Sequence, residues 1–129
     1  MRRKKGFTLV EIMIVVAIIA LLAAIAIPNL LRARVSAAQA AAKSVLHTLS
    51  TAYETYSADN NGTYNVSINN LFATQNPRYI NNDFSDGTYY GFYTFTCAVG
   101  AGFYTCTAYG ASGADIYDIE TGGVVSWGP

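Results

Sequence analysis

The sequence contains few charged residues and very few of the side chains that bind metals or perform catalysis. Only 12% of its 129 residues are charged, whereas a typical soluble domain has about 25%. One histidine and two cysteines are too few for the usual zinc sites. Neither a Ser-His-Asp arrangement nor a glycine-rich phosphate loop occurs. We therefore expect no catalytic residues, no metal and no cofactor. The low charge favours a membrane or a packed assembly as the environment.

Positive charge is gathered at the start of the chain, although the formal net charge is zero. Residues 2–5 supply four of the eight lysines and arginines, so the rest of the chain has four basic and eight acidic residues, a formal charge of −4. Nucleic-acid-binding domains usually present a basic face. The acidic body of this chain therefore indicates that it has no nucleic-acid site.

A long apolar run follows the basic cluster. Residues 7–27 contain only two polar side chains, Thr8 and Glu11. As a helix these 21 residues would span roughly 32 Å, close to the ~30 Å thickness of the bilayer hydrocarbon core. By the positive-inside rule the basic cluster stays in the cytoplasm, and the rest of the chain lies across the membrane. The pattern predicts a single-pass membrane protein.

A cleaved secretory signal peptide is the alternative interpretation of this segment. Ala24-Ile25-Ala26 resembles the cleavage site of such a peptide. The apolar run, however, is longer than the ~7–15 residues of a typical signal core. It also contains Glu11, and a carboxylate at the centre of a bilayer costs about 2.5–3.5 kcal/mol. A residue that costly indicates a function.

The start of the apolar run carries a specific motif, Lys5-Gly6-Phe7-Thr8-Leu9-Val10-Glu11. Followed by an apolar helix and Pro28, it resembles the N-terminus of type IV pilins and of the pseudopilins of type II secretion systems. The resemblance implies that residues 1–6 are a cytoplasmic leader peptide, which a prepilin peptidase removes between Gly6 and Phe7. It also implies N-methylation of Phe7 and a role for Glu11 in subunit assembly.

Location and partners follow from the same resemblance. A pilin is held in the inner membrane by its apolar helix, here residues 7–28, with its head in the periplasm, and later enters an extracellular pilus or a periplasmic pseudopilus. Its partners would be further copies of itself in a helical filament, the prepilin peptidase and methyltransferase, the pilus or type II secretion assembly machinery, and inner-membrane lipid.

Helical periodicity continues beyond the membrane and predicts an amphipathic helix over residues 29–59. Its apolar face recurs at steps of three and four residues: Leu31, Val35, Ala38, Ala42, Val45, Leu49, Ala52 and Tyr56. The opposite side is expected to carry Arg32, Arg34, Gln39, Lys43 and Glu54. Pro28 lacks an amide hydrogen and predicts a kink. Asn60, Asn61 and Gly62 favour the left-handed conformation that ends a helix.

The remaining residues predict a loop and then a sheet, within a head that spans residues 29–129. Residues 60–87 are rich in asparagine and should form a connecting loop, with a short helical turn over Ser67 to Ala73 that Ser67 caps. From 88 to 129 the apolar period becomes two. The expected strands are Tyr89–Val99, Phe103–Tyr109, Asp115–Ile119 and Val124–Trp127. The predicted fold class is α+β: a long N-terminal helix packed on a small antiparallel sheet of three or four strands, as in pilins.

The first predicted hairpin places the two cysteines opposite each other. With the turn centred on Ala101-Gly102, the pairs on the apolar face are Cys97 with Cys106, Phe95 with Ala108, and Val99 with Tyr104. Thr94 and Thr96 then face Thr107 and Thr105 on the other side. Because export places the head in an oxidising compartment, we expect a Cys97–Cys106 disulfide. Two buried free thiols are the alternative.

Three functions fit these features. The first is a structural subunit of a type IV pilus, polymerised through its N-terminal helix for adhesion, twitching motility or DNA uptake. The second is a pseudopilin of a type II secretion system, although the head lacks the Asp-Pro-Trp-Gly motif and acidic calcium loop associated with major pseudopilins. The third is a single-span anchor that presents a binding domain. Asp115, Asp118 and Glu120 are weak candidates for cation ligands, because Asp115 and Asp118 fall on opposite faces of a strand.

Overall fold

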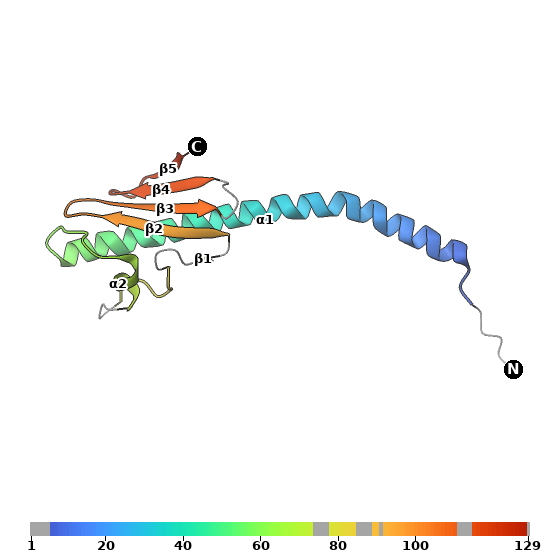
Figure 1. The fold of residues 1–129 in the computed structure, drawn as a ribbon, viewed down its shortest axis with the longest axis horizontal. Helices are drawn as coiled ribbons and strands as arrows, with labels where there is room; N and C mark the ends of the chain where they lie inside the picture. Colours follow the sequence, from blue (N-terminus) through green and yellow to red (C-terminus); the bar gives the residue numbers. More distant parts are fainter. Residues whose placement is uncertain (1–5, 74–77, 85–88, 91, 111–114, 129) are drawn as a thin grey trace. The chain divides into compact units, whose positions relative to one another are not determined.

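The computed structural model describes residues 6–73, 78–84, 89–90, 92–110 and 115–128. The described residues form two helices, α1 (Leu9–Asp59) and α2 (Ile68–Ala73), and five strands (Figure 1). The strands are β1 (Tyr89–Tyr90), β2 (Tyr93–Val99), β3 (Tyr104–Gly110), β4 (Ile116–Glu120) and β5 (Val125–Gly128). The chain divides into two compact units, an N-terminal unit (Met1–Ala37) and a C-terminal unit (Ala38–Pro129).

Helix α1 contains 51 residues and ends where the sequence predicts. After its last residue, Asn61 and Gly62 adopt positive φ angles of 55° and 81°. The Gly62 amide donates a hydrogen bond of 2.8 Å to the carbonyl oxygen of Ser57. This bond joins the Gly62 amide to the carbonyl five residues earlier, as in the Schellman arrangement, and satisfies a carbonyl that the helix itself leaves unpaired.

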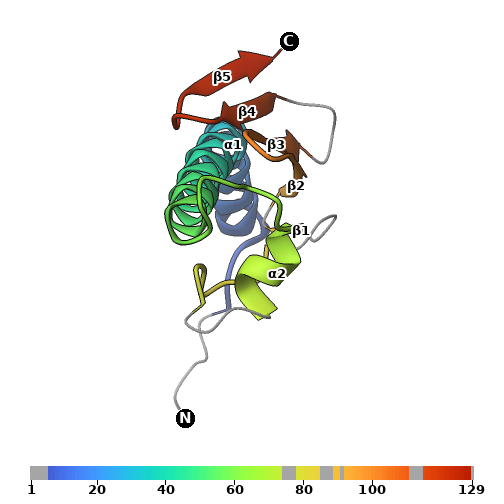
Figure 2. The ribbon, with the colours of Figure 1, turned by 90° about the vertical axis from the view of Figure 1, so that its left-hand side faces the viewer.

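The core of the C-terminal unit lies between α1 and one face of the sheet (Figure 2). The helix contributes Ala42, Val45, Leu46, Leu49, Ala52 and Tyr53, and the strands contribute Tyr93, Phe95, Tyr104, Cys106, Ala108, Tyr117 and Ile119. The predicted apolar face of the helix is therefore confirmed at Ala42, Val45, Leu49 and Ala52. Leu31 and Val35 belong to the N-terminal unit and are 58% and 53% exposed.

Three polar residues of α1 make contacts with the sheet or the loop, so the expectation that they lie on the opposite side was wrong. They are Gln39, Lys43 and Glu54. Gln39 donates a hydrogen bond to Asp115, the Lys43 ammonium lies 4.8 Å from the ring centroid of Tyr117, and Glu54 accepts a hydrogen bond from Tyr64. The sheet and the loop cover the apolar face of the helix and also part of the surface on either side of it. Polar side chains that flank the stripe therefore meet polar groups and rings at its edges.

The sheet is antiparallel throughout, with the order β1-β2-β3-β4-β5. The α+β fold class is thus confirmed. The first predicted strand is divided into β1 and β2, and the other three correspond to β3, β4 and β5. The predicted register holds, with Cys97 opposite Cys106, Phe95 opposite Ala108 and Val99 opposite Tyr104. The threonines share the other face, but their pairing differs: Thr96 is opposite Thr107, Thr94 opposite Tyr109, and Thr105 opposite Ala98.

The segment between helix and sheet contributes more to the core than its sequence suggests. The short helix α2 follows Ser67, whose hydroxyl accepts a hydrogen bond of 3.4 Å from the Asn70 amide, as predicted for a cap. Six apolar side chains of this segment are buried: Tyr64, Val66, Ile68, Leu71, Ile80 and Phe84. They are separated by exposed asparagines such as Asn65 and Asn69. The loop therefore forms part of the core.

The predicted disulfide joins Cys97 of β2 to Cys106 of β3, and the Cα atoms of the pair are 4.1 Å apart. Cys106 is fully buried, on the face of the sheet that packs against α1. The bond therefore links two neighbouring strands that both contribute aromatic side chains to the core.

Replacing both cysteines by alanine is expected to lower the free energy of unfolding of the exported protein by about 2–3 kcal/mol, because the disulfide closes a loop of about ten residues. Denaturant unfolding of the wild type and of Cys97→Ala/Cys106→Ala measures the difference. The wild type in reductant should behave like the variant. Two alkylatable thiols in the untreated exported protein would contradict this prediction.

Candidate functional site

Helix α1 begins with a reciprocal cap between Thr8 and Glu11. Glu11 Oε2 accepts hydrogen bonds from the Thr8 amide at 2.7 Å and from the Thr8 hydroxyl at 2.8 Å. The Glu11 amide donates to Thr8 Oγ1 at 3.3 Å. These bonds form a capping box, in which the two side chains satisfy amides that the first helical turn leaves unpaired. Glu11 therefore has a role in the start of its own helix, four residues after Phe7.

The apolar run that follows exposes its large side chains. Every large apolar side chain from Phe7 to Val35 is more than half exposed; Phe7, for example, is 84% exposed and Val35 is 53% exposed. Among the described residues, α1 is the one helix long and apolar enough to cross a membrane, a property that signal sequences share. Exposed apolar surface of this extent marks a site of contact with lipid or protein. The helix continues across Pro28, and the kink there stays a prediction.

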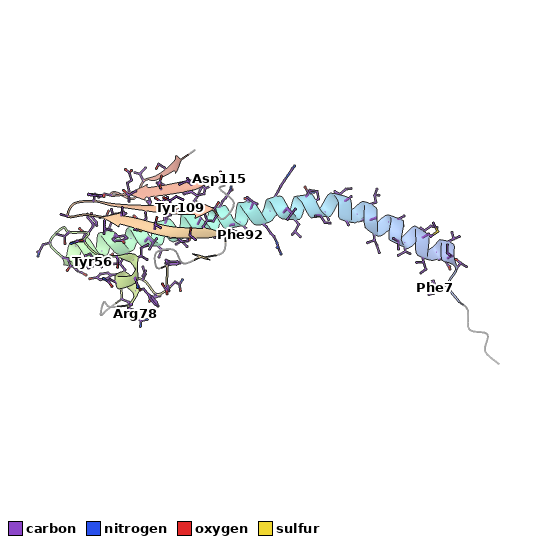
Figure 3. All side chains as sticks on the ribbon, in the orientation of Figure 1. Phe7, Tyr56, Arg78, Phe92, Tyr109 and Asp115 are labelled. Atoms are coloured by element: carbon purple, nitrogen blue, oxygen red, sulfur yellow. A yellow bond between two sulfur atoms is a disulfide. The ribbon has the colours of Figure 1, made fainter. Side chains whose placement is uncertain are left out.

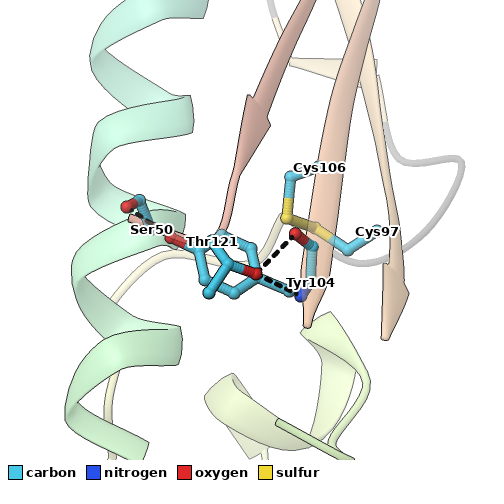
Figure 4. Close-up of a disulfide and its surroundings, with 5 residues drawn as sticks. All are labelled: Ser50, Cys97, Tyr104, Cys106 and Thr121. Carbon is cyan, nitrogen blue, oxygen red and sulfur yellow. Dashed lines mark hydrogen bonds between the residues drawn. A yellow bond between two sulfur atoms is a disulfide. The ribbon is translucent and has the colours of Figure 1, made fainter. Parts of the chain in front are cut away.

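In the C-terminal unit, Tyr104 of β3 joins the sheet to the helix (Figure 4). Its ring is fully buried and stacks on Tyr53 of α1, with ring centroids 5.1 Å apart. Its hydroxyl lies 2.7 Å from the Ser50 hydroxyl, and its amide donates to Thr121 Oγ1 at 3.0 Å. Burial raises the pKa of the Tyr104 phenol, the bond to Ser50 lowers it, and the nearby Glu54 charge raises it. The net effect is a raised pKa, so the phenol stays protonated at neutral pH.

Glu54 of α1 receives hydrogen bonds from three different segments. Its Oε2 accepts from the Tyr64 hydroxyl at 2.9 Å, and its Oε1 accepts from the Tyr104 hydroxyl at 3.3 Å and from the Gly122 amide at 3.2 Å. Gly122 lies in the β4–β5 turn with φ of 95°, a conformation that glycine adopts without strain. The carboxylate thus ties the helix to the loop, to β3 and to this turn.

The other polar candidates are dispersed over the C-terminal unit. His47 is exposed on α1, Asp115 and Asp118 are half-buried, and Glu120 is exposed. Over residues 6–73, 78–84, 89–90, 92–110 and 115–128, no group of three or more His, Cys, Asp or Glu side chains is placed to hold a metal ion.

Sequence reasoning identified Glu11 but missed the cap that it forms. A threonine followed three residues later by a glutamate is itself the signature of a capping box, so the signal was present in Thr8-Leu9-Val10-Glu11. Glu54 was missed because helical periodicity assigned it to the solvent side. Its partners come from residues 10, 50 and 68 positions away along the chain, and no local pattern predicts contacts of that kind.

Comparisons with known proteins concentrate on this N-terminal region. Residues 1–27 match the family model of the prokaryotic N-terminal methylation motif. The chain is 51% identical over 61 residues to the type IV wide pilus major component PilA4 of Thermus thermophilus, and 52% identical over 54 residues to the type IV major pilin protein PilA of Myxococcus xanthus. It is 42% identical over 60 residues to the type II secretion system core protein G of Aeromonas hydrophila. Its homologues are type IV pilins and type II secretion core G proteins.

Each match covers only part of this chain and of its relative. The Thermus match covers 47% of this chain and 47% of that protein. The Myxococcus match covers 42% of this chain and 24% of that protein, and the Aeromonas match covers 46% and 42%. The chain thus spans less than half the length of these relatives. No solved structure gives a significant match. The methylation-motif match includes Gly6, Phe7, Thr8 and Glu11, so the capping box lies within the matched segment.

Proposed function

We propose that this pilin homologue is a structural subunit of a type IV pilus. The precursor is held in the inner membrane by residues 7–28, with its N-terminus in the cytoplasm and its C-terminal unit in the periplasm. After removal of residues 1–6 it polymerises with further copies through its N-terminal helix. The filament serves adhesion, motility or DNA uptake, and the subunit has no enzymatic role.

The exposed apolar surface of the N-terminal unit is the observation that carries this proposal. The large apolar side chains from Phe7 to Val35 are each more than half exposed, and such a surface is stable only when lipid or protein covers it. Lipid covers it in the precursor. In a filament, the N-terminal helices of neighbouring copies cover it instead.

Glu11 supplies the specificity of this packing. Cleavage before Phe7 creates a new amine, which the family motif implies is methylated and which keeps its positive charge. In a bundle of apolar helices that excludes water, the Glu11 carboxylate of one subunit accepts the amine of its neighbour. An unpaired partner in such a core costs about 3–5 kcal/mol, which disfavours docking in any other register.

Substitution of Gly6 by valine is expected to leave residues 1–6 attached, because the peptidase motif requires a small residue before Phe7. Gly6→Ala is the matched control and should be processed. Intact-mass and N-terminal analysis of the membrane fraction measures both. The wild type should begin Phe7-Thr8-Leu9 and carry one N-methyl group. An N-terminus at Ile27 would instead establish a secretory signal peptide.

A pseudopilin of a type II secretion system is the second candidate, and the match to core protein G supports it. The pilin matches have higher identity, 51% and 52% against 42%, and favour the pilus. Electron microscopy of material sheared from cells, with an antibody to the C-terminal unit, separates the candidates. Long labelled surface filaments support the pilus. Loss of exported folded proteins on gene deletion, with no surface filaments, supports the pseudopilus. A label confined to membranes, with neither effect, supports a membrane-anchored binding domain.

A further inference from the structure

The sequence contains one Asn-Gly pair, Asn61-Gly62, and it lies directly after the end of α1. Asparagine is a thermolabile residue, and it is most reactive before glycine, because glycine has no side chain to hinder an attack by its own backbone nitrogen. Both residues of the pair are exposed. Apart from its chain neighbours, no atom lies within 4 Å of the place that a Cβ atom of residue 62 would occupy. The pair is therefore open to water.

The reaction available to this pair is cyclisation followed by hydrolysis. The Gly62 backbone nitrogen attacks the side-chain carbonyl carbon of Asn61 and forms a C–N bond. The bond from that carbon to the side-chain nitrogen breaks, and the nitrogen leaves as ammonia with the proton of the Gly62 amide. Water then adds to a carbonyl of the resulting succinimide ring and opens it, which leaves aspartate or isoaspartate. The reaction requires no oxidant, reductant or enzyme.

The folded chain holds the attacking nitrogen in a different interaction. The Gly62 amide donates its hydrogen to the Ser57 carbonyl oxygen at 2.8 Å, in the cap that ends α1. Asn61 has a φ of 55°, in the left-handed region, where ψ is about +47°. At that ψ the next nitrogen lies nearly anti to Cβ, whereas ring closure requires the two atoms to be nearly eclipsed. The cap must therefore open before Asn61 can react.

Side-chain contacts on both sides of the pair hold this cap closed. The Asn60 side-chain amide donates to the Tyr56 carbonyl oxygen at 2.9 Å, and the Thr63 hydroxyl donates to the Asn60 carbonyl oxygen at 2.9 Å. The Tyr79 hydroxyl donates to Asp59 Oδ2 at 2.8 Å. The ring of Tyr56, in the last turns of α1 (Figure 3), meets the ring of Tyr79 edge-on, with centroids 5.5 Å apart. These contacts fasten the helix end to the loop.

We propose that Asn61 is a site of spontaneous deamidation, which the cap of α1 suppresses in the folded chain and which opening of the cap permits. The product carries a new negative charge at the C-terminal end of α1, where the helix dipole disfavours it, two residues from Asp59. Isoaspartate also lengthens the backbone by one carbon, so the cap cannot re-form as before. The site belongs to the C-terminal unit alone, and the proposal stands whether or not the chain forms filaments.

The test follows deamidation of the full-length chain in detergent micelles, in warm and mildly alkaline buffer. Peptide mass spectrometry identifies the modified asparagine and separates aspartate from isoaspartate. In guanidinium, which unfolds the chain, Asn61 should react faster than any other asparagine. In the folded chain its rate should be lower by about tenfold or more, because only the population with an open cap reacts.

A cap variant, Asn60→Ala/Thr63→Val, keeps the Asn61-Gly62 pair and removes two hydrogen bonds of the cap. Folded, it should deamidate about tenfold faster than the wild type, the effect of losing two hydrogen bonds of ordinary strength. In guanidinium the two chains should react at the same rate. The matched control is Thr48→Val, which removes a similar hydroxyl bond earlier in α1 and should keep the wild-type rate. Circular dichroism verifies that each variant is folded.

Three results would overturn the proposal. Another asparagine could react before Asn61 in the unfolded chain. The folded wild type could deamidate at Asn61 as fast as the unfolded chain, which would show that the cap does not restrain the Gly62 nitrogen. The folded cap variant could react no faster than Thr48→Val, which would show that the reaction does not pass through an open cap.

Discussion

Glu11→Ala is expected to abolish sheared filaments while the chain is still inserted in the membrane and processed. The substitution leaves the amine of a neighbouring Phe7 without its carboxylate inside an apolar bundle. That loss is worth about 3–5 kcal/mol for each subunit contact, and it recurs at every subunit of a filament. The measurement is the amount of chain in the sheared fraction, divided by its amount in the membrane fraction.

Two further variants separate the charge of Glu11 from its capping role. Glu11→Gln keeps the capping box, because glutamine also serves at that position, but it removes the charge. Thr8→Ala removes the cap, at a cost of about 0.5–2 kcal/mol, and keeps the charge. We expect Glu11→Gln to lose filaments as Glu11→Ala does, and Thr8→Ala to retain them. Filament loss in Thr8→Ala with normal filaments in Glu11→Gln would show that the helix cap, and not the charge, is required.

Tyr104→Ala is expected to cost about 3–5 kcal/mol of folding free energy, the range for removing a large buried aromatic side chain. The variant loses the stacking contact with Tyr53 and also leaves the Ser50 hydroxyl buried without its partner. Since small domains have a total stability of about 5–15 kcal/mol, this loss removes a large part of the stability of the C-terminal unit. Denaturant unfolding followed by near-ultraviolet circular dichroism measures the change.

Tyr109→Ala is the matched control, because Tyr109 is a tyrosine of the same strand that is 44% exposed. Its effect on stability should stay within about 0.5 kcal/mol. Tyr104→Phe keeps the ring and loses only the hydroxyl contacts, so it should fall between the two. Equal stability of Tyr104→Ala and Tyr109→Ala would mean that the aromatic stack does not hold α1 to the sheet.

Local patterns were sufficient to predict the elements of this fold and one of its long-range contacts. The end of α1 follows from the left-handed preference of Asn61 and Gly62, and the strands follow from a period of two. The register of β2 and β3 followed from one turn, because shifting a strand by one residue would have put Phe95 and Cys97 on the solvent side. The disulfide then required only that two cysteines be opposite each other.

Contacts between distant segments were not predictable in the same way. Glu54 receives donors from Tyr64, Tyr104 and Gly122, which meet only after the loop and the β4–β5 turn have packed on α1. The burial of Ile80 and Phe84 was missed for the same reason, since their neighbours in sequence are polar. The Glu11 cap is different, because its signal was local. A carboxylate in an apolar run indicates a role in assembly, and the same Glu11 carboxylate also caps the start of its own helix.

The most direct test of the assembly proposal is a cryo-electron microscopy reconstruction of filaments sheared from cells that produce this chain. The account predicts that residues 7–35 of many copies pack together along the filament axis, with each C-terminal unit outside this bundle. It also predicts that each Glu11 lies within hydrogen-bonding distance of the Phe7 amine of a neighbouring copy. Filaments that lack this chain, or a core in which the N-terminal helices do not touch one another, would contradict it.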